Sequence, residues 1–363
     1  MSTTSELRGL VKYPAGNEFR RVLRQRVAEY FENRGISTHG GPRMWIKTAT
    51  IIVWFLASYL LLLLWATTPL QAVLLSVSLG LSIAGIGFNL QHDGSHGSYS
   101  SKRWLNKIMA TFLDLTGGSS YLWKWQHNVI HHTYTNVEGI DEDLKVGALG
   151  RLAPDQKRLA VHRFQHIYIW FLYAFLPLKW WFLDDYVSLG QGRLGDHKVP
   201  RPRGVELFLF FFGKFQFYAW ALVLPLFLHS WTVVVPVLVL TSFVTGVTLA
   251  VVFQLAHCLE EADFPARPAN GELELPFDES QLATTVDFAR NNPLATWFLG
   301  GLNFQVEHHL FPKICHIHYS AIAPIVEKTC AEFGIPYRNN VTFFDALRSH
   351  ARWLYRMGRA EPA

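Results

Sequence analysis

Two long stretches without a charged residue constrain this chain more than any other feature of its sequence. One runs from Thr48 to His92 and the other from Phe215 to Leu259. Each is about twice the ~20 residues that a helix needs to cross a bilayer, so each predicts a helical hairpin. A helix buried in a soluble core is too short to explain either stretch. We therefore predict an all-α integral membrane protein with four transmembrane helices in two hairpins.

Composition and charge agree with this interpretation. Only 17% of the residues are charged, against roughly 25% in ordinary globular proteins. The first forty residues are polar and basic and contain no apolar segment of the kind that a signal peptide needs. The net charge of +5 indicates attraction to anionic lipid or to an acidic partner, whereas nucleic acid is not an expected partner because the basic residues flank the spans. We expect the spans at about 48–67, 70–90, 205–228 and 231–256.

Histidines gather beside the apolar stretches. His92 and His96 lie in the motif HDGSH, and His257 lies near the end of the second stretch. The motifs HNVIHH and QVEHH supply five more, namely His127, His131, His132, His308 and His309. A spacing of three or four residues places side chains on one face of a helix, and imidazole is the commonest protein ligand for transition metals. The sequence therefore predicts eight metal ligands.

Two moderately apolar stretches, 104–123 and 164–183, must be placed so that the eight histidines can meet. If only one stretch crossed the membrane, one group of histidines would lie on the opposite face. We therefore expect both stretches to be interfacial or re-entrant. Lys214 lies near the start of the third span and is expected to extend to the interface. The basic residues before the first and third spans place the common face in the cytoplasm.

The predicted organisation follows from this topology. It comprises a cytoplasmic amphipathic N-terminal region (1–47), a first hairpin (48–92), a cytoplasmic or interfacial cap with two histidine motifs (93–204), a second hairpin (205–257) and a cytoplasmic cap with the third motif (258–363). Residues 17–33 have the spacing of an amphipathic helix that lies on the membrane surface. Its arginines fit either positive-inside bias or a docking surface for an acidic electron carrier, and we favour the first explanation.

Eight imidazoles are too many for one ion, and two ions with about four nitrogen donors each fit the number. Magnesium and calcium are excluded because they prefer oxygen ligands. A zinc hydrolase would normally hold one metal with three protein ligands. From the donors alone iron, copper, zinc and nickel stay open, and two irons are the choice if the chemistry uses dioxygen.

Other polar residues have weaker claims to a role. Metal-bound histidines usually donate their second N–H to a carboxylate or a carbonyl. The candidate carboxylates are Asp93, Asp141, Asp143 and Asp287. Asp93, next to His92, is the most natural of them, although any of the four could simply face water. Five single histidines near span ends are expected to be interfacial and not ligands, namely His162, His166, His197, His229 and His350. We assign no role to the three cysteines.

The motifs HDGSH, HNVIHHTYTN and NFQVEHHLFP, with the following ICHIHY, resemble the membrane fatty acid desaturase family. Gln305 marks the front-end branch, because many relatives place a histidine there. The similarity continues through FRRVLRQRVAEYF and RFQHIYIWFLYAF to RWL near the C-terminus. Over nearly its whole length the chain is similar to cyanobacterial acyl-lipid Δ6 desaturases, which act on linoleoyl chains.

This resemblance implies two iron ions (Fe²⁺) held by the eight histidines. For Gln305 three roles stay open: it binds iron, it holds a water, or it does neither. The implied reaction uses O2 and external electrons to introduce a cis double bond into a fatty acyl lipid. The chain has no His-Pro-Gly-Gly motif of a fused cytochrome b5, so a separate donor is expected, as with ferredoxin in the cyanobacterial relatives. The expected location is a bacterial inner membrane or a thylakoid membrane, with the site on the cytoplasmic face.

Two other functions are compatible with parts of this pattern. A di-iron acyl hydroxylase on the same scaffold would share the histidine motifs and differ only in its product. A metal transporter would place its ligands at mid-bilayer in interrupted helices, whereas these histidines lie at span ends. A desaturase must hold a featureless acyl chain in a narrow apolar tunnel. Aromatic side chains could line it but also form interface belts and cores, so none is assigned individually, and Trp123 and Trp125 beside the second motif are the first to mutate.

Overall fold

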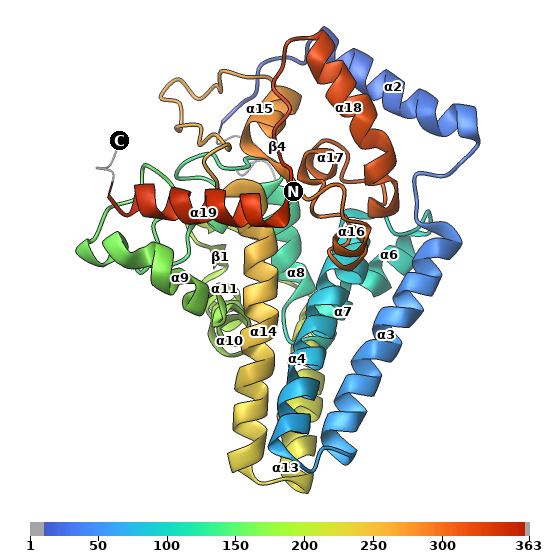
Figure 1. The fold of residues 1–363 in the computed structure, drawn as a ribbon, viewed down its shortest axis with the longest axis vertical. Coiled ribbons are helices and arrows are strands. Elements are labelled where there is room, and N and C mark those ends of the chain that lie inside the picture. Colours follow the sequence, from blue (N-terminus) through green and yellow to red (C-terminus); the bar gives the residue numbers. More distant parts are fainter. Residues whose placement is uncertain (1–10, 360–363) are drawn as a thin grey trace.

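Two hairpins of long apolar helices form a stem, and shorter helices form a cap at one end of it (Figure 1). The structure, a computed structural model, describes residues 11–359, so the first ten residues of the predicted N-terminal region lie outside it. Within this described part, four helices are long and apolar enough to cross a membrane. They are Gly41–Leu64, Pro69–His96, Val205–Leu228 and Trp231–His257. The predicted four-helix membrane fold is confirmed.

The spans follow the apolar sequence closely, apart from the start of the first one. Its helix α3 (Gly41–Leu64) begins earlier than the expected Thr48, because Pro42 favours a helix start and Lys47 is buried against the cap. In the second span α4 (Pro69–Ile86) starts with a capping box between Thr68 and Gln71. Its last part is formed by the π-helical turn η1 (Gly87–Gln91) and α5 (His92–His96).

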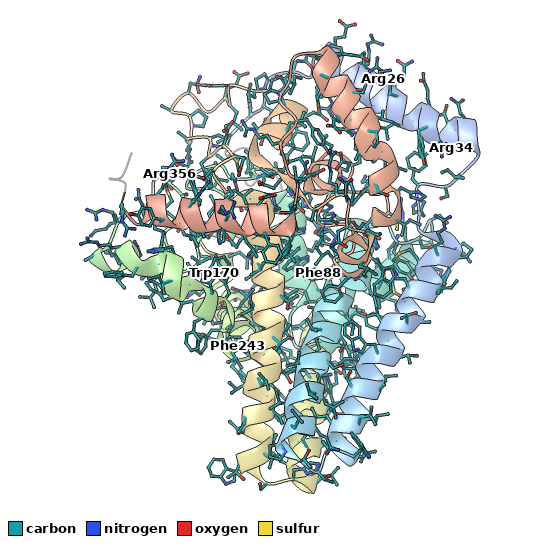
Figure 2. All side chains as sticks on the ribbon, viewed as in Figure 1. Arg26, Arg34, Phe88, Trp170, Phe243 and Arg356 are labelled. Atoms are coloured by element: carbon teal, nitrogen blue, oxygen red, sulfur yellow. The ribbon has the colours of Figure 1, made fainter. Side chains whose placement is uncertain are left out.

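The second hairpin encloses α4 from the other side. It is built from α12 (Val205–Tyr218), η6 (Ala219–Val223), α13 (Leu224–Leu228) and α14 (Trp231–His257). In the most apolar part of each span, 61% of the residues are buried in the second span but only 22% in the third. The second span is therefore the centre of the stem, and the outer helices present exposed apolar side chains to lipid. Figure 2 shows Phe243 on the stem and Arg26, Arg34 and Arg356 on the cap.

The two ambiguous stretches form short, broken helices that do not match the length of a span. The first contains α6 (Arg103–Ala110), α7 (Phe112–Leu115) and α8 (Ser120–Trp123), and the π-helical turn η2 (Lys124–His131) follows it. The second contains α9 (Gln165–Tyr173), α10 (Leu176–Lys179) and most of η5 (Trp180–Asp184), with η4 (Ala160–Phe164) before it and α11 (Asp185–Gln191) after it. Both lie beside the stem, as the need to bring the histidines together predicted.

Side chains satisfy the backbone where α7 ends among apolar helices. Four successive carbonyls each accept a hydrogen bond from a side-chain nitrogen. The pairs are Gln216 to Asp114 (2.9 Å), Trp220 to Leu115 (3.0 Å), Trp181 to Thr116 (2.9 Å) and Lys214 to Gly117 (2.6 Å). Unpaired carbonyls at this depth would cost several kcal/mol each. Lys214 therefore does not extend to the interface as expected, and it is only 3% exposed.

The cap is assembled from segments that are far apart in the sequence. Its remaining helices are α2 (Glu18–Arg34), η3 (Glu142–Leu144), α15 (Phe277–Thr284), α16 (Pro293–Phe298), α17 (Gln305–Leu310), η7 (His316–His318), α18 (Tyr319–Glu332) and α19 (Phe343–Met357). Its strands are two residues long each. The strands β1 (Arg193–Leu194) and β2 (His197–Lys198) pair antiparallel, and β3 (Asp287–Phe288) and β4 (Asn339–Asn340) pair parallel.

Helix α2 is amphipathic, but its apolar face packs on protein. Phe19, Leu23 and Val27 are at most 2% exposed and belong to one cluster with residues of α18, such as Ile322 and Val326. In Figure 1 the two helices lie together at the end of the cap farthest from the stem tip. The expectation of a membrane-surface helix is therefore wrong, because the spacing of apolar residues indicates a buried face without indicating what covers it.

Candidate metal centre

The eight predicted histidines meet where four elements end. They come from α5, from η2 and the residue after it, from the last residue of α14, and from α17. Seven of them are at most 7% exposed, and His96 is partly buried. The apolar stem thus delivers His92, His96 and His257 to the cap, and the cap supplies the others.

The histidines form two groups joined by His132. His92, His96, His127 and His308 make one group, and His131, His257 and His309 make the other. His132 lies with His308 and His309, one from each group. Within each of these sets the candidate ligand nitrogens lie within 4.8 Å of one another. The arrangement matches the predicted number of donors for two ions.

Local backbone features bring the motifs together. In the π-helical turn η2 a backbone N–H bonds the carbonyl five residues earlier, instead of four as in an α-helix. His132 N–H accordingly donates to the carbonyl of His127 at 3.0 Å. This wider turn carries His132 onto the side that an α-helix would give only to His131. Gly94 in HDGSH lets α6 approach closely, because a Cβ there would lie 2.6 Å from the Ala110 nitrogen. The motif therefore needs glycine at this position for packing.

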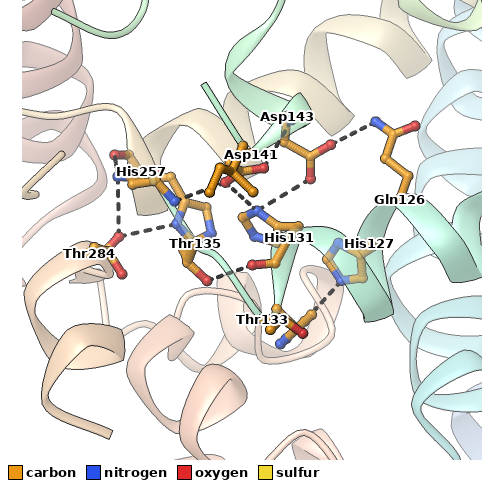
Figure 3. Close-up of polar contacts among 12 residues, drawn as sticks. Gln126, His127, His131, Thr133, Thr135, Asp141, Asp143, His257 and Thr284 are labelled. Carbon is orange, nitrogen blue, oxygen red and sulfur yellow. Dashed lines mark hydrogen bonds and ion pairs between the residues drawn. The ribbon is translucent and has the colours of Figure 1, made fainter. Parts of the chain in front are cut away.

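The outer nitrogens of four histidines are held by protein acceptors. Nδ1 of His131 lies 2.9 Å from Asp141, Nδ1 of His309 2.8 Å from Gln281, Nδ1 of His308 3.3 Å from Tyr319, and Nδ1 of His257 3.3 Å from the Thr284 carbonyl. Figure 3 shows the bonds made by His131 and His257. A proton on Nδ1 leaves the lone pair of Nε2 free for a metal.

The inner nitrogens fit a metal site. Nε2 of His131, His308 and His309 is buried, and none has a hydrogen-bond partner among residues 11–359. Nε2 of His127 lies 3.2 Å from Nε2 of both His92 and His132. Nitrogens this close share either a proton or a cation, and buried polar atoms without partners are otherwise costly. The donor set therefore suits borderline transition metals such as iron.

Electrostatics favour neutral ligands around one anionic edge. Burial and the neighbouring histidines lower the pKa of His127, His132, His308 and His309 well below its usual value, which leaves the imidazoles neutral.

His131 differs from these four histidines. Burial lowers its pKa, but Asp141 and Asp143 outweigh this and raise it to about 9. Burial likewise opposes ionisation of Asp141, yet His131 and the N–H groups of Asn136 and Asp143 hold the pKa of Asp141 below its usual value. The part of the site around His131 and Asp141 therefore favours a positive charge, whether a proton or a metal ion.

The four candidate carboxylates have different partners. Asp141 contacts His131 directly, and Asp143 lies 3.5 Å from the same ring and accepts from Gln126. Asp93 instead accepts from His316 (2.8 Å) and Cys315 (3.0 Å).

Asp287 accepts from the Val306 nitrogen and from Tyr337, which also bonds Glu307. It therefore holds the backbone of α17, the helix that carries the third motif.

Several contacts around the site were not predicted from the sequence. Gln281 and Thr284 hold the rings of His309 and His257, although no motif marks them, and Tyr319, the last residue of ICHIHY, holds the ring of His308. His316 Nε2 lies 2.7 Å from the buried ammonium of Lys47, so this lysine joins the first span to the cap. The motif ICHIHY pointed to His316, but its partner could be found only from the fold.

Gln305 is buried beside His257, with its amide nitrogen 2.9 Å from Nε2. A half-turn of the Gln305 amide brings its oxygen to the same point. Gln305 therefore lies where a further ligand or a water-holding group would act.

The five single histidines lie outside these groups. Four of them bond backbone carbonyls, namely His162 (Ala148), His197 (Ile140), His229 (Leu63) and His350 (Cys258). His166 contacts the ring of Tyr355 edge to face. The three cysteines are buried and free, and Cys315 contacts Asp93.

An apolar cavity reaches the first group of histidines. It is lined by His92, Phe88, Leu249 and Trp181, among others. A second cavity of about 550 Å³ adjoins it and opens towards the charged residues Lys145, Lys179 and Arg193. Five residues line both cavities, namely Leu113, Gly118, Trp123, Trp180 and Phe253. We call the joined cavities the acyl passage, defined by these five residues.

Trp123 in the wall of this passage contacts one of the ligand candidates directly. Its ring stacks on His127 with centroids 4.7 Å apart, and it also contacts Trp180 and Phe253. Trp125, the other tryptophan beside the second motif, is instead 7% exposed in a cluster with Leu122, Ile130 and Leu194.

Comparison with known proteins agrees with the geometry. The model of the fatty acid desaturase family matches residues 67–340. A sn-1 linoleoyl-lipid 6-desaturase of Arthrospira platensis is 38% identical, over 98% of this chain and 96% of its own length. The protein of the same name from Synechocystis sp. is 37% identical, over 96% and 98%. An acyl-lipid (8-3)-desaturase of Physcomitrium patens is 40% identical, over 95% of this chain and 72% of its own length.

Proposed function

The chain belongs to the fatty acid desaturase family and is an oxidoreductase that uses dioxygen to desaturate a fatty acyl lipid, and we propose that it introduces a cis double bond at Δ6 of a linoleoyl chain. The names of the two cyanobacterial relatives support this position. Gln305, at the place of a histidine in other branches, supports the front-end assignment. The observation that carries the chemistry is the convergence of eight histidines, seven of them buried, beside an apolar passage.

We assign one iron ion (Fe²⁺) to each group of histidines, with His132 between them and Gln305 beside His257. Bound iron supplies the redox chemistry that reduces dioxygen with external electrons while the acyl chain loses two hydrogens. The residues of the chain position the substrate and exclude water. Trp123 orients the acyl chain against the first group, and the apolar walls exclude water.

The electron donor and the membrane are further parts of the proposal. We propose a separate one-electron carrier, a ferredoxin, because the described cap consists of the histidine site and its supporting helices. We also propose that the cap faces the cytoplasm of a bacterial inner membrane or a thylakoid membrane. The basic residues before the first and third spans support this orientation.

The test is fatty-acid methyl ester analysis of a cyanobacterial host that lacks its own Δ6 desaturase and supplies ferredoxin. Expression with linoleate should yield a Δ6 triene, which the His308→Ala/His309→Ala variant should not form. His229→Gln, a matched control at the far end of the stem, should form it normally. A double bond elsewhere would refute the Δ6 position, and a hydroxylated chain would favour a hydroxylase.

A further inference from the structure

Two walls of the acyl passage come from segments that do not form continuous helices. One wall is the re-entrant segment that contains α7 and α8, with Leu113, Gly118 and Trp123. The other is η5 and the residues around it, with Trp180 and Asp185. Short helices among apolar spans have few backbone bonds of their own that fix their separation, so other contacts must set the width of the passage.

Lys214 of α12 contacts both walls at once. Its ammonium donates to the carbonyl of Gly117 at 2.6 Å on one side. On the other side it donates to the carbonyl of Trp180 at 2.9 Å and to Asp185 at 2.7 Å. Gly118, which directly follows the first acceptor Gly117, lines both cavities, and so does the second acceptor, Trp180. The three bonds therefore join the two walls where the cavities meet.

The surroundings show that this position is built for the ammonium. Lys214 is 3% exposed, and its charge faces the rings of Tyr186 (5.3 Å) and Phe210 (5.8 Å). Gly117 has φ +92°, and a Cβ there would lie 2.6 Å from Trp181. Only glycine can therefore bring this carbonyl to the lysine. An unpaired lysine within a span is energetically costly, whereas the ammonium of Lys214 is paired with Asp185 and two carbonyls.

We propose that Lys214, with Asp185, is a positioning residue that fixes the width of the acyl passage and so determines which carbons of the chain are desaturated. The proposal rests on the proposed acyl passage but not on the Δ6 position. Lys214 acts on the protein walls and touches neither the substrate nor the histidines. Its loss should therefore change where the chain lies without removing the metal centre.

The test compares Lys214→Met/Asp185→Asn with Gln216→Leu. The first variant removes both charges of the bridge together and keeps the apolar stem of residue 214. The control removes the hydrogen bond from the Gln216 side chain to the Asp114 carbonyl, which lies in the same first wall. The other hydrogen bond of this side chain goes to the Gly213 carbonyl in its own helix and not to the second wall. The readouts are the double-bond position, kcat and KM, and the iron content of the purified protein.

For Lys214→Met/Asp185→Asn we expect double bonds at several positions and a kcat/KM that is about 10- to 100-fold lower, because misplacement by 1 Å can cost about 100-fold. Iron content should be unchanged, and Gln216→Leu should retain the product of the wild type. A folded variant with the wild-type product position and KM would overturn the proposal. The double-bond positions made by each variant are compared with the position made by the wild-type protein. A wild-type product other than Δ6 would therefore refute the Δ6 proposal and leave the proposal on Lys214 open to the same test.

If the double variant does not accumulate, Lys214→Gln takes its place, because the shorter amide can reach one wall but not both. Mixed double-bond positions from this variant would support the proposal. Failure of both variants to accumulate, while Gln216→Leu accumulates normally, would assign Lys214 to folding alone and overturn it.

Discussion

His131 has a carboxylate partner that the other seven histidines lack in the described structure. Asp141 accepts its Nδ1 proton at 2.9 Å and is itself held by the backbone N–H groups of Asn136 and Asp143. We predict that Asp141→Asn lowers iron affinity by about 10- to 100-fold, because the ring loses its orientation and basicity. Titration of the apoprotein with Fe²⁺ checks this loss directly.

Asp143→Asn is the matched control for that prediction. Asp143 lies farther from the ring, at 3.5 Å, and its other contact is Gln126. Its substitution should weaken iron binding less than that of Asp141. Equal losses in the two variants would mean that the total negative charge matters and that the single hydrogen bond does not.

Trp123 and Trp125 are neighbours in sequence with different surroundings. Trp123 lines both cavities and stacks on His127, whereas Trp125 is buried in a cluster of the cap. Trp123→Ala should therefore lower kcat/KM by about 10- to 100-fold with little loss of stability. Trp125→Ala should mainly destabilise the fold, by about 3–5 kcal/mol. Product analysis and thermal melting of both variants separate these effects, and the reverse pattern would contradict the assignment.

The helices of the stem were predictable because length and apolarity are local properties. The turns that shape the site were not. The π-helical turns η1 and η2 depend on surrounding contacts, and no residue pattern in HNVIHH predicts that His132 joins the same side as His131. For α2 the apolar face was predicted correctly, but its partner α18 lies about 300 residues later in the chain.

Helix α19 provides a test of how the cap is attached to the stem. Its His350 is buried, donates from Nδ1 to the Cys258 carbonyl (2.6 Å) and accepts at Nε2 from Tyr173 (2.9 Å). Burial lowers the pKa of His350 to about 4, against 6.5 in an unfolded chain. Below pH ~6.5 the unfolded chain binds a proton that the folded protein does not, so stability is lost as the pH falls towards 4.

This loss should reach about 3 kcal/mol at low pH. Thermal melting of detergent-solubilised protein between about pH 7.5 and about pH 4.5 measures it. His350→Gln should be less stable than the wild type at neutral pH, yet its melting temperature should fall less on acidification. The other buried histidines titrate in both proteins and cancel in the comparison. Parallel curves for the two proteins would contradict the role of His350.

The orientation of the whole protein follows from the parity of its spans. With four spans, the cap segments before α3 and after α14 lie on one side, and the turns after α3 and α13 lie on the other. The sequence could predict this arrangement, because histidines that bind the same metal site must lie on the same side of the membrane. It could not predict which helix lies in the centre, because that depends on how α4 packs between α3 of its own hairpin and α14 of the second.

Cysteine labelling in intact cells tests the orientation. Cys258, Cys315 and Cys330 are all buried, so one new surface cysteine can be labelled without removing them. Ala28 on α2 and Thr67 in the turn after α3 are both exposed. In a bacterial inner membrane we expect a membrane-impermeant maleimide to label Thr67→Cys in intact cells and Ala28→Cys only after permeabilisation. The opposite pattern would place the histidine site outside the cytoplasm, where a cytoplasmic ferredoxin cannot reach it, and labelling of both before permeabilisation would contradict a four-span topology.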